Sequence, residues 1–482
     1  MFPRIISITT VLVLITIPLF ATIIQVPGEQ PTIQAGINAA VNSDTILVAP
    51  GTYQENIHFR EKGIVVASFY MIDPNLTYIE QTIINGSSPT HPDTGSCVLI
   101  VSDSAYTTAD TSAALIGFTI TGGSGTRWLD EHGAGLYREG GAILIQYLSP
   151  RISHNIIRNN HITNQSGVIS TGGGAIRCGD GNPDMANNII TQNSALYGGG
   201  IVLNYTGAML RNNIICNNAA GDAYGGGGGL WILANATYPK IIENNTIAYN
   251  SPGQYAAGGG IRLWNADATL RNNVIWANEI GQIYRSGGTV SVIYSNIQGG
   301  YPGEGNIDAD PLFLPWNYYL SAASPCVDAG DTTAIYNDPE DILNPGYAEW
   351  PSEGLLRNDM GTYGGPGRTF LPDIQTGIQE DQNHGLSQEQ IILENHPNPF
   401  YDHTAITYQM PEDHRVKGFK IYDIAGREVR DLTGELMAAT NHASITWDGR
   451  DDHGRQLSSG VYVYSITTDR GKASRKFTLM RK

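Results

Sequence analysis

The side chains best suited to ligand chemistry are arginines and tryptophans at equivalent positions of separate aliphatic strands. Arg177, Trp231 and Arg262 occupy one such position, and Trp264 lies two residues beyond the last of them. Aromatic faces pack against sugar rings, and guanidinium groups donate paired hydrogen bonds to hydroxyls or carboxylates. We therefore expect substrate binding along this column, with an extended polysaccharide as ligand. A competing interpretation stays open: these side chains only cover a solenoid surface under loops.

Catalytic and metal-binding residues are harder to find. Arg177, Asp180 and Asp184 form the tightest constellation, which could hold Ca²⁺ and support β-elimination on an acidic sugar. Aspartates in Asp-Gly and Asn-Pro turns, however, commonly serve turn geometry alone. The sequence shows no carboxylate pair at the spacing that glycoside hydrolysis needs. It therefore leaves the catalytic residues unknown, and an enzyme, if there is one, would be of the polysaccharide lyase type.

An insertion at residues 122–140 stands out among the repeats by its length. It contains Trp128, Asp130, Glu131, His132 and Tyr137. Long insertions in repeat proteins map to loops on one face, which often carry function. We expect this segment to wall one side of a groove.

The elements that position these residues repeat five times between residues 141 and 278. Each repeat holds a glycine-rich turn followed by an aliphatic strand, then an asparagine followed by a second strand. Apolar residues alternate, as in Ile143 and Ile145 or Ile261 and Leu263, which indicates strands with one buried face. Such a repeat predicts a stacked parallel solenoid. Residues 31–41, with apolar residues at helical spacing, are expected to cap its open end.

Two asparagine columns recur at the same place in every repeat. Because their parity matches inward aliphatic residues, these amides must be buried, and a buried amide needs hydrogen-bond partners. We expect them to form structural ladders between coils. The columns are Asn155, Asn188, Asn213, Asn245 and Asn273, and then Asn160, Asn193, Asn218, Asn250 and Asn278.

Composition and the N-terminus narrow the class of protein. Arg4 precedes an apolar run that ends at Ala21, which is typical of a secretory signal peptide. The net charge is −17, from 45 acidic and 28 basic residues, and this argues against nucleic acid as a partner. No later segment is apolar enough to serve as a transmembrane anchor after signal cleavage. The four cysteines form no close-spaced pair, which argues against a zinc knuckle.

Two family resemblances add to this reading. The segment Thr32-Ile-Gln-Ala-Gly-Ile-Asn-Ala-Ala, with Asp44-Thr-Ile-Leu-Val-Ala-Pro-Gly-Thr-Tyr, resembles the entry to pectin-lyase-like β-helices. The catalytic motifs of pectin methylesterases and galacturonases are missing. Pro397-Asn-Pro-Phe, Trp447-Asp-Gly-Arg-Asp, Ser459-Gly-Val-Tyr and the basic tail are similar to type IX secretion sorting domains and to the immunoglobulin-like domain of flagellar hook-capping proteins. That second resemblance implies the type IX secretion machinery as a partner.

The sequence thus predicts an all-β chain: a right-handed parallel β-helix followed by a small immunoglobulin-like β-sandwich. The expected divisions are a signal peptide (1–21), the β-helix (22–370), a linker (371–390) and the sorting domain (391–482). Two functions remain. One is a protein, secreted or on the outer surface of a Gram-negative bacterium, that binds extracellular polysaccharide and either degrades it or leaves it intact. The other is a non-catalytic structural or adhesive surface protein.

Overall fold

The computed structural model describes residues 21–102, 113–130, 132–234, 239–314, 318–342 and 344–372, and most of 392–481 with short gaps. The chain divides into two compact units, residues 1–320 with 324–374, and residues 321–323 with 375–482. Residues 1–20 of the expected signal peptide and residues 373–390 of the expected linker lie outside the described residues.

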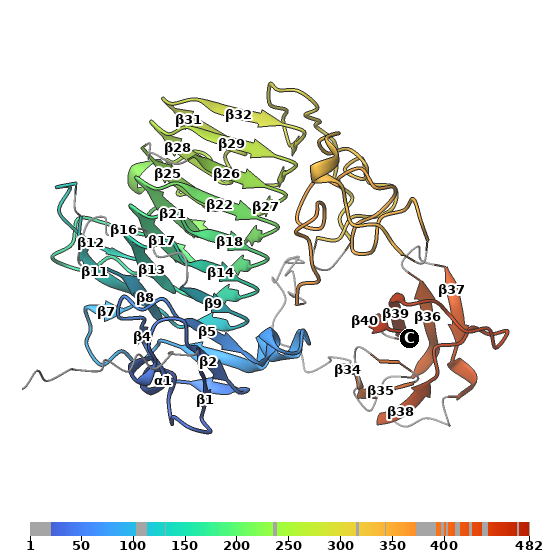
Figure 1. Cartoon of the computed structure of the whole chain (residues 1–482). Helices are drawn as coiled ribbons and strands as arrows, with labels where there is room; N and C mark the ends of the chain where they lie inside the picture. The colour runs from blue at the N-terminus through green and yellow to red at the C-terminus, as the bar shows by residue number, and fades with distance from the viewer. Residues whose placement is uncertain are drawn as a thin grey trace, which may run out of the picture. The chain divides into compact units, whose positions relative to one another are not determined.

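Three long parallel sheets build the first unit, with ten, nine and eight strands in the described part of the chain (Figure 1). The ten-stranded sheet contains β1 (Ile23–Val26), β2 (Thr45–Val48), β5 (Val65–Ser68), β9 (Ala114–Ile116), β14 (Arg151–Ser153), β18 (Asp184–Ala186), β22 (Ala208–Arg211), β26 (Lys240–Glu243), β29 (Ala268–Arg271) and β32 (Val290–Ile293). The nine-stranded sheet contains β3 (Gly51–Tyr53), β6 (Thr82–Asn85), β10 (Thr119–Thr121), β15 (Ile156–Arg158), β19 (Ile189–Thr191), β23 (Ile214–Cys216), β27 (Thr246–Ala248), β30 (Val274–Trp276) and β33 (Asn296–Ile297). The eight-stranded sheet contains β4 (Ile57–His58), β8 (Val98–Val101), β13 (Ile143–Gln146), β17 (Ile176–Gly179), β21 (Ile201–Asn204), β25 (Leu230–Leu233), β28 (Ile261–Trp264) and β31 (Ile283–Ser286). The prediction of a right-handed parallel β-helix is confirmed.

Register explains the alternating sequence pattern. Ile143 pairs with Ile176, which pairs with Ile201, and this column continues through Leu230 and Ile261. These residues are fully buried in one core that runs through the coils. The glycine before each strand is required by close approach between coils. A Cβ on Gly141, for example, would lie 2.0 Å from the carbonyl oxygen of Gly174 on the next coil.

The asparagine columns form the expected ladders. Asn155 Nδ2 donates to Asn188 Oδ1 at 3.1 Å, and Asn188 Nδ2 donates to Asn213 Oδ1 at 3.0 Å. The second column repeats this pattern, with Asn160 Nδ2 donating to Asn193 Oδ1 at 2.9 Å. Residues before the first ladder have positive φ, which Asn tolerates better than most side chains. They are His154, Asn187, Asn212, Asn244 and Asn272, with φ of 57°, 57°, 53°, 51° and 54°.

Helices and irregular segments cover the rest of this unit. Helix α1 (Ile33–Ala39) begins at Thr32, whose side chain accepts from Ala35 N, and buries Ile33 and Ile37 on the core. It is the expected cap, although the helix ends before Val41, which is exposed. Side chains from the described part of residues 318–371 pack on the nine-stranded sheet, where Tyr318, Tyr319 and Tyr363 lie in one cluster with Ile189 and Ile214. The remaining helices are α2 (Thr77–Gln81), η1 (Phe69–Met71), η2 (Ala223–Gly225) and η3 (Ala334–Tyr336).

The insertion at residues 122–140 is a hairpin and not a plain loop. Strand β11 (Gly125–Leu129) pairs antiparallel with β12 (Leu136–Glu139), so that Trp128 faces Tyr137. These strands join β7 (Thr94–Gly95) and β16 (Thr171–Gly172) in a small sheet. Arg138 anchors the hairpin, because its guanidinium donates to the carbonyls of Pro92 and Gly125 at 2.9 and 2.8 Å. A further short pair consists of β20 (Ser194–Ala195) and β24 (Ala219–Ala220).

The second unit consists of two antiparallel sheets over a separate core. One sheet contains β34 (Ile392–His396), β35 (Thr404–Gln409) and β38 (His442–Trp447). The other contains β37 (Glu428–Asp431), β36 (Val416–Asp423), β39 (Gly460–Thr468) and β40 (Lys472–Leu479), with η4 (Thr433–Glu435) nearby in sequence. Tyr462, Tyr464 and Ile466 alternate into the core with Trp447 and Phe477. This arrangement agrees with the expected immunoglobulin-like sandwich.

Two further expectations concern membranes and cysteines. In the described part of the chain, no helix is both long and apolar enough to cross a bilayer. Cys97, Cys178, Cys216 and Cys326 are free and buried. Cys178 pairs in register with Ile145 and Leu203, so it is the small core residue that the repeat predicts.

Candidate functional site

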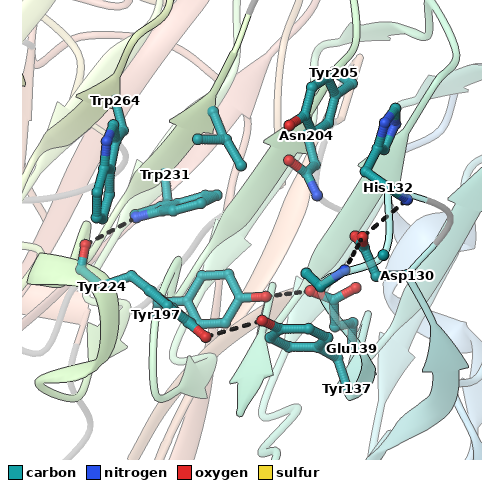
Figure 2. A pocket seen from close by; sticks show the side chains of 13 residues that line it. Asp130, His132, Tyr137, Glu139, Tyr197, Asn204, Tyr205, Tyr224, Trp231 and Trp264 are labelled. Carbon is teal, nitrogen blue, oxygen red and sulfur yellow. Dashed lines mark hydrogen bonds between the residues drawn. The ribbon is translucent and has the colours of Figure 1, made fainter. Parts of the chain in front are cut away.

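A hollow of about 340 Å³ opens where the hairpin stands beside the eight-stranded sheet (Figure 2). We call it the hairpin hollow. The hairpin segment lines it with Asp130, His132, Gly133, Ala134, Tyr137 and Glu139, the sheet strands with Asn204, Trp231, Leu233 and Trp264, and the intervening loops with Tyr197, Tyr205 and Tyr224. The hairpin therefore walls one side of a hollow, as the length of the insertion predicts.

Aromatic rings pack against one another along the sheet side of the hairpin hollow. Trp231 is 4% exposed, and its indole N–H donates to the carbonyl of Tyr224 at 3.2 Å. The ring of Tyr197 meets that of Trp231 edge-on, with centroids 4.9 Å apart. Tyr224 extends this cluster to Tyr137, whose hydroxyl lies 2.9 Å from its own. Trp264 is 36% exposed at the same hollow, so part of its surface is free to contact a ligand.

Below these rings lies a buried ion pair. Glu139, at the end of β12, lies with its Oε2 2.9 Å from Arg177 Nε on β17, and both side chains are almost fully buried. The hydroxyl of Tyr197 donates to the other oxygen, Oε1. Both carboxylate oxygens of Glu139 are therefore occupied by protein groups.

The polar contacts continue from Arg177 to the tip of the hairpin. Arg177 Nη1 donates to Gln146 Oε1, and Gln146 Nε2 donates to Asp180 Oδ2 at 3.0 Å. Asp180 Oδ1 in turn lies 3.0 Å from Nε2 of His132. Gly179 leaves room for this chain of contacts. A Cβ there would lie 2.4 Å from both Arg177 Nη1 and Gln146 Oε1.

Burial shapes the protonation of this cluster. It raises the pKa of the Glu139 carboxyl, and the Arg177 ion pair and the Tyr197 hydrogen bond oppose that effect. Burial and the nearby Glu139 carboxylate raise the pKa of Tyr197 well above its ordinary value. Burial, together with the hydrogen bond to Tyr224, also raises the pKa of Tyr137. The two tyrosines with raised pKa therefore stay protonated at neutral pH and act as hydrogen-bonding groups, not as bases.

One polar side chain of the hairpin hollow is left unsatisfied. Asn204, the last residue of β21, is 8% exposed, and its Oδ1 is buried without a hydrogen-bond partner among the described residues. A buried amide oxygen without a donor is costly, and such groups in folded proteins often await a ligand or water. Asn204 is therefore the polar group on this wall of the hollow whose hydrogen bonding is incomplete within the protein.

The structure separates the four substrate-binding residues expected from the sequence. These positions do form one column across neighbouring strands, because Arg177 pairs with Val202, Val202 with Trp231, and Trp231 with Arg262. Trp231 and Trp264 line the hairpin hollow, but the two arginines do not. Arg177 is buried behind Glu139, and Arg262 is 9% exposed. The guanidinium of Arg262 lies over the rings of Tyr284 at 4.3 Å and Trp264 at 5.8 Å.

The candidate Ca²⁺ constellation is not assembled. Asp184 lies on the ten-stranded sheet and pairs with Arg211 at 2.7 Å, whereas Arg177 and Asp180 bond to the hairpin and to Gln146. Within the described ranges, no group of three or more His, Cys, Asp or Glu side chains is arranged to hold a metal ion.

Glu139, Tyr197 and Tyr224 are residues that sequence reasoning missed. Each lies just before a glycine run: Glu139 before Gly140 and Gly141, Tyr197 before residues 198–200, and Tyr224 before residues 225–229. A side chain at that point precedes the turn into the eight-stranded sheet and lies beside the same face. The recurrence of Tyr before glycine runs is the signal that could have found two of them.

The two carboxylates that line the hairpin hollow are engaged by other groups of the protein. Glu139 is saturated, and Asp130 Oδ1 accepts from the backbone N–H groups of His132 and Ala134 at 3.0 and 3.1 Å. The rest of the lining consists of aromatic rings, the Leu233 side chain, the His132 imidazole, the Asn204 amide and the small residues Gly133 and Ala134.

Comparisons with known proteins agree with this architecture. A model of the right-handed β-helix region matches residues 105–297, and a model of the FlgD immunoglobulin-like domain matches residues 401–472. Among curated proteins, no sequence matches this chain. A crystal structure of dimeric latent PorU from Porphyromonas gingivalis aligns at 19% identity and a TM-score of 0.16, over 20% of this chain and 10% of that one. The chain thus joins a right-handed β-helix to a domain similar to the FlgD immunoglobulin-like domain.

Proposed function

We propose that the β-helix binds extracellular polysaccharide and that the hairpin hollow is its binding site. The observation that carries this proposal is the pairing of Trp264, an aromatic surface partly open to solvent, with the unsatisfied amide of Asn204 in one hollow. Sugar rings present an apolar face for the indole and hydroxyls for the amide. The resemblance of residues 32–53 to pectin-lyase-like β-helices supports the same class of ligand.

Binding without cleavage is the function that the side chains support best. The two carboxylates of the hollow, Asp130 and Glu139, are held by backbone and side-chain hydrogen bonds, and the catalytic motifs of pectin esterases and galacturonases are missing from the sequence. A general acid or base needs a proton site free to face the substrate. The protein on this proposal captures or displays polysaccharide at the cell surface or outside the cell.

A glycan screen with full-length protein tests the proposal. Glycans that bind in the screen are then titrated by calorimetry against the wild-type protein and the Trp264→Ala variant. We expect the variant to bind at least tenfold more weakly with unchanged circular dichroism. Tyr255→Ala is the matched control, because Tyr255 is 84% exposed and does not line the hollow. Absence of any glycan ligand would favour a structural or adhesive role instead, and equal affinity of Trp264→Ala would place the binding site outside the hairpin hollow.

For the second unit we propose export through the type IX secretion machinery of a Gram-negative bacterium. The support is the similarity of residues 395–482 to type IX sorting domains and the basic C-terminal tail. On this proposal the signal peptide serves only the inner membrane. Deleting residues 391–482 should trap the protein in the periplasm, and fusing them to a periplasmic reporter should carry the reporter outside. Normal surface or medium levels of the truncated chain would rule out the sorting role.

A further inference from the structure

We infer that the hairpin hollow selects one or two uncharged sugar rings and rejects uronic acids. This inference rests on the proposed function and names the class of sugar. It runs against the first expectation from the sequence, in which exposed arginines would hold sugar carboxylates.

The first argument is the charge of the lining. Of the described residues that line the hollow, two are carboxylates, Asp130 and Glu139, none is lysine or arginine, and the one histidine, His132, is already paired with Asp180 at 3.0 Å. A sugar carboxylate is normally held by a guanidinium or ammonium group. Glu139 is neutralised by Arg177, so a sugar carboxylate would instead meet the like charge of Asp130 in a partly desolvated space, where repulsion is weakly screened.

The second argument concerns the nearest arginine. Arg177 is 1% exposed, and its guanidinium is bound to Glu139 Oε2 and Gln146 Oε1. Releasing it for a ligand would leave Glu139 as a buried carboxylate without its cation, which is strongly unfavourable. The Arg177 guanidinium is therefore engaged within the protein and does not serve a ligand.

The third argument is the nature of the remaining groups. Asn204 offers a neutral amide, which can both donate to and accept from hydroxyls. Its Oδ1 lacks a donor among the described residues. Trp264 offers ring surface for the apolar face of a sugar, and the buried Trp231 supports the wall behind it. All of these partners suit hydroxyl-bearing, uncharged rings.

Size sets the length of the ligand segment. A volume of about 340 Å³ lies at the lower end of the range of about 300–1,000 Å³ for small-molecule pockets. The hollow thus accommodates a chain end or a single branch and not a long stretch of polymer.

Matched trisaccharides test the selectivity. Gluco- and galacto-configured trisaccharides are titrated by calorimetry as neutral sugars and as the derivatives in which the terminal C6 is a carboxylate. We expect the neutral form to bind at least tenfold more tightly. Equal or tighter binding of the acidic form would overturn the inference while leaving the proposed function intact.

A charge-removing variant locates the selectivity. Asp130→Asn keeps the oxygen that accepts from His132 N and Ala134 N but loses the negative charge. It should narrow the neutral-to-acidic affinity ratio at least threefold, whereas Asp184→Asn, outside the hollow, should leave the ratio unchanged. An unchanged ratio in Asp130→Asn contradicts the inference. If no trisaccharide binds in either form, or if Trp264→Ala does not weaken binding, the proposed function itself fails and the inference fails with it.

Discussion

Replacing Asn213 by Leu removes one rung from the first asparagine ladder. Asn213 Nδ2 donates to the Met185 carbonyl at 2.8 Å and to Asn245 Oδ1 at 2.9 Å. Its Oδ1 accepts from the backbone N–H and the Nδ2 of Asn188, both at 3.0 Å. Leu has a similar size but can make none of these bonds. Asn188 keeps its bond to the carbonyl of Ile152, yet its buried backbone N–H loses its acceptor.

The expected cost follows from these lost contacts. An orphaned buried group costs about 1–3 kcal/mol, and each lost neutral bond about 0.5–1.5 kcal/mol, so we expect unfolding free energy to fall by about 2–5 kcal/mol. Urea unfolding of the full chain, followed by circular dichroism of the β-helix transition, measures this. Ile215→Leu, two residues further along the same buried strand, is the control and should cost less than about 1.5 kcal/mol. A loss in Asn213→Leu no greater than in this control would refute the ladder as a stabilising element.

Three other outcomes follow from single contacts. Burial lowers the pKa of His154 to about 4, so the unfolded chain takes up a proton at a higher pH than the folded chain does. The free energy of unfolding should therefore fall by up to about 3 kcal/mol as the pH drops from about 6.5 to 4. Asn stands at this corner in the later repeats, so His154→Asn should remove that part of the pH dependence when urea unfolding is compared at pH 7 and 4.5, and an unchanged dependence would contradict the assignment. Arg177→Met should lower the free energy of unfolding by about 3–5 kcal/mol, because it leaves Glu139 as a buried carboxylate without its cation. Adding Glu139→Gln should restore most of that free energy in the same assay, and no recovery would argue against the ion pair as the cause. Gly179→Ala places a Cβ 2.4 Å from Gln146 Oε1, so it should lower the thermal midpoint and weaken glycan binding, and wild-type values for both would show that the contact chain is not needed.

Much of the β-helix could be predicted because its information is local and repeated. A two-residue alternation fixes which side chains face the core, and five repeats fix the columns, so Asn213 and Cys178 were placed correctly.

The site could be predicted only in part, because its contacts join segments that do not repeat. Arg177 has an outward register position, yet the hairpin folds over it and supplies Glu139 from 38 positions earlier in the sequence. Parity specifies the face of a sheet, but it says nothing of what covers that face. Trp264, further along the sheet, keeps the exposure that the sequence suggested.

The position of a bound sugar is the most direct test of the account. A crystal structure of the full-length protein, grown with the neutral oligosaccharide that binds most tightly, should show a sugar ring in the hairpin hollow. We expect its apolar face against Trp264 and a hydroxyl within hydrogen-bonding distance of Asn204 Oδ1. Sugar density elsewhere on the β-helix, with the hollow vacant at saturating ligand, would contradict the central claim.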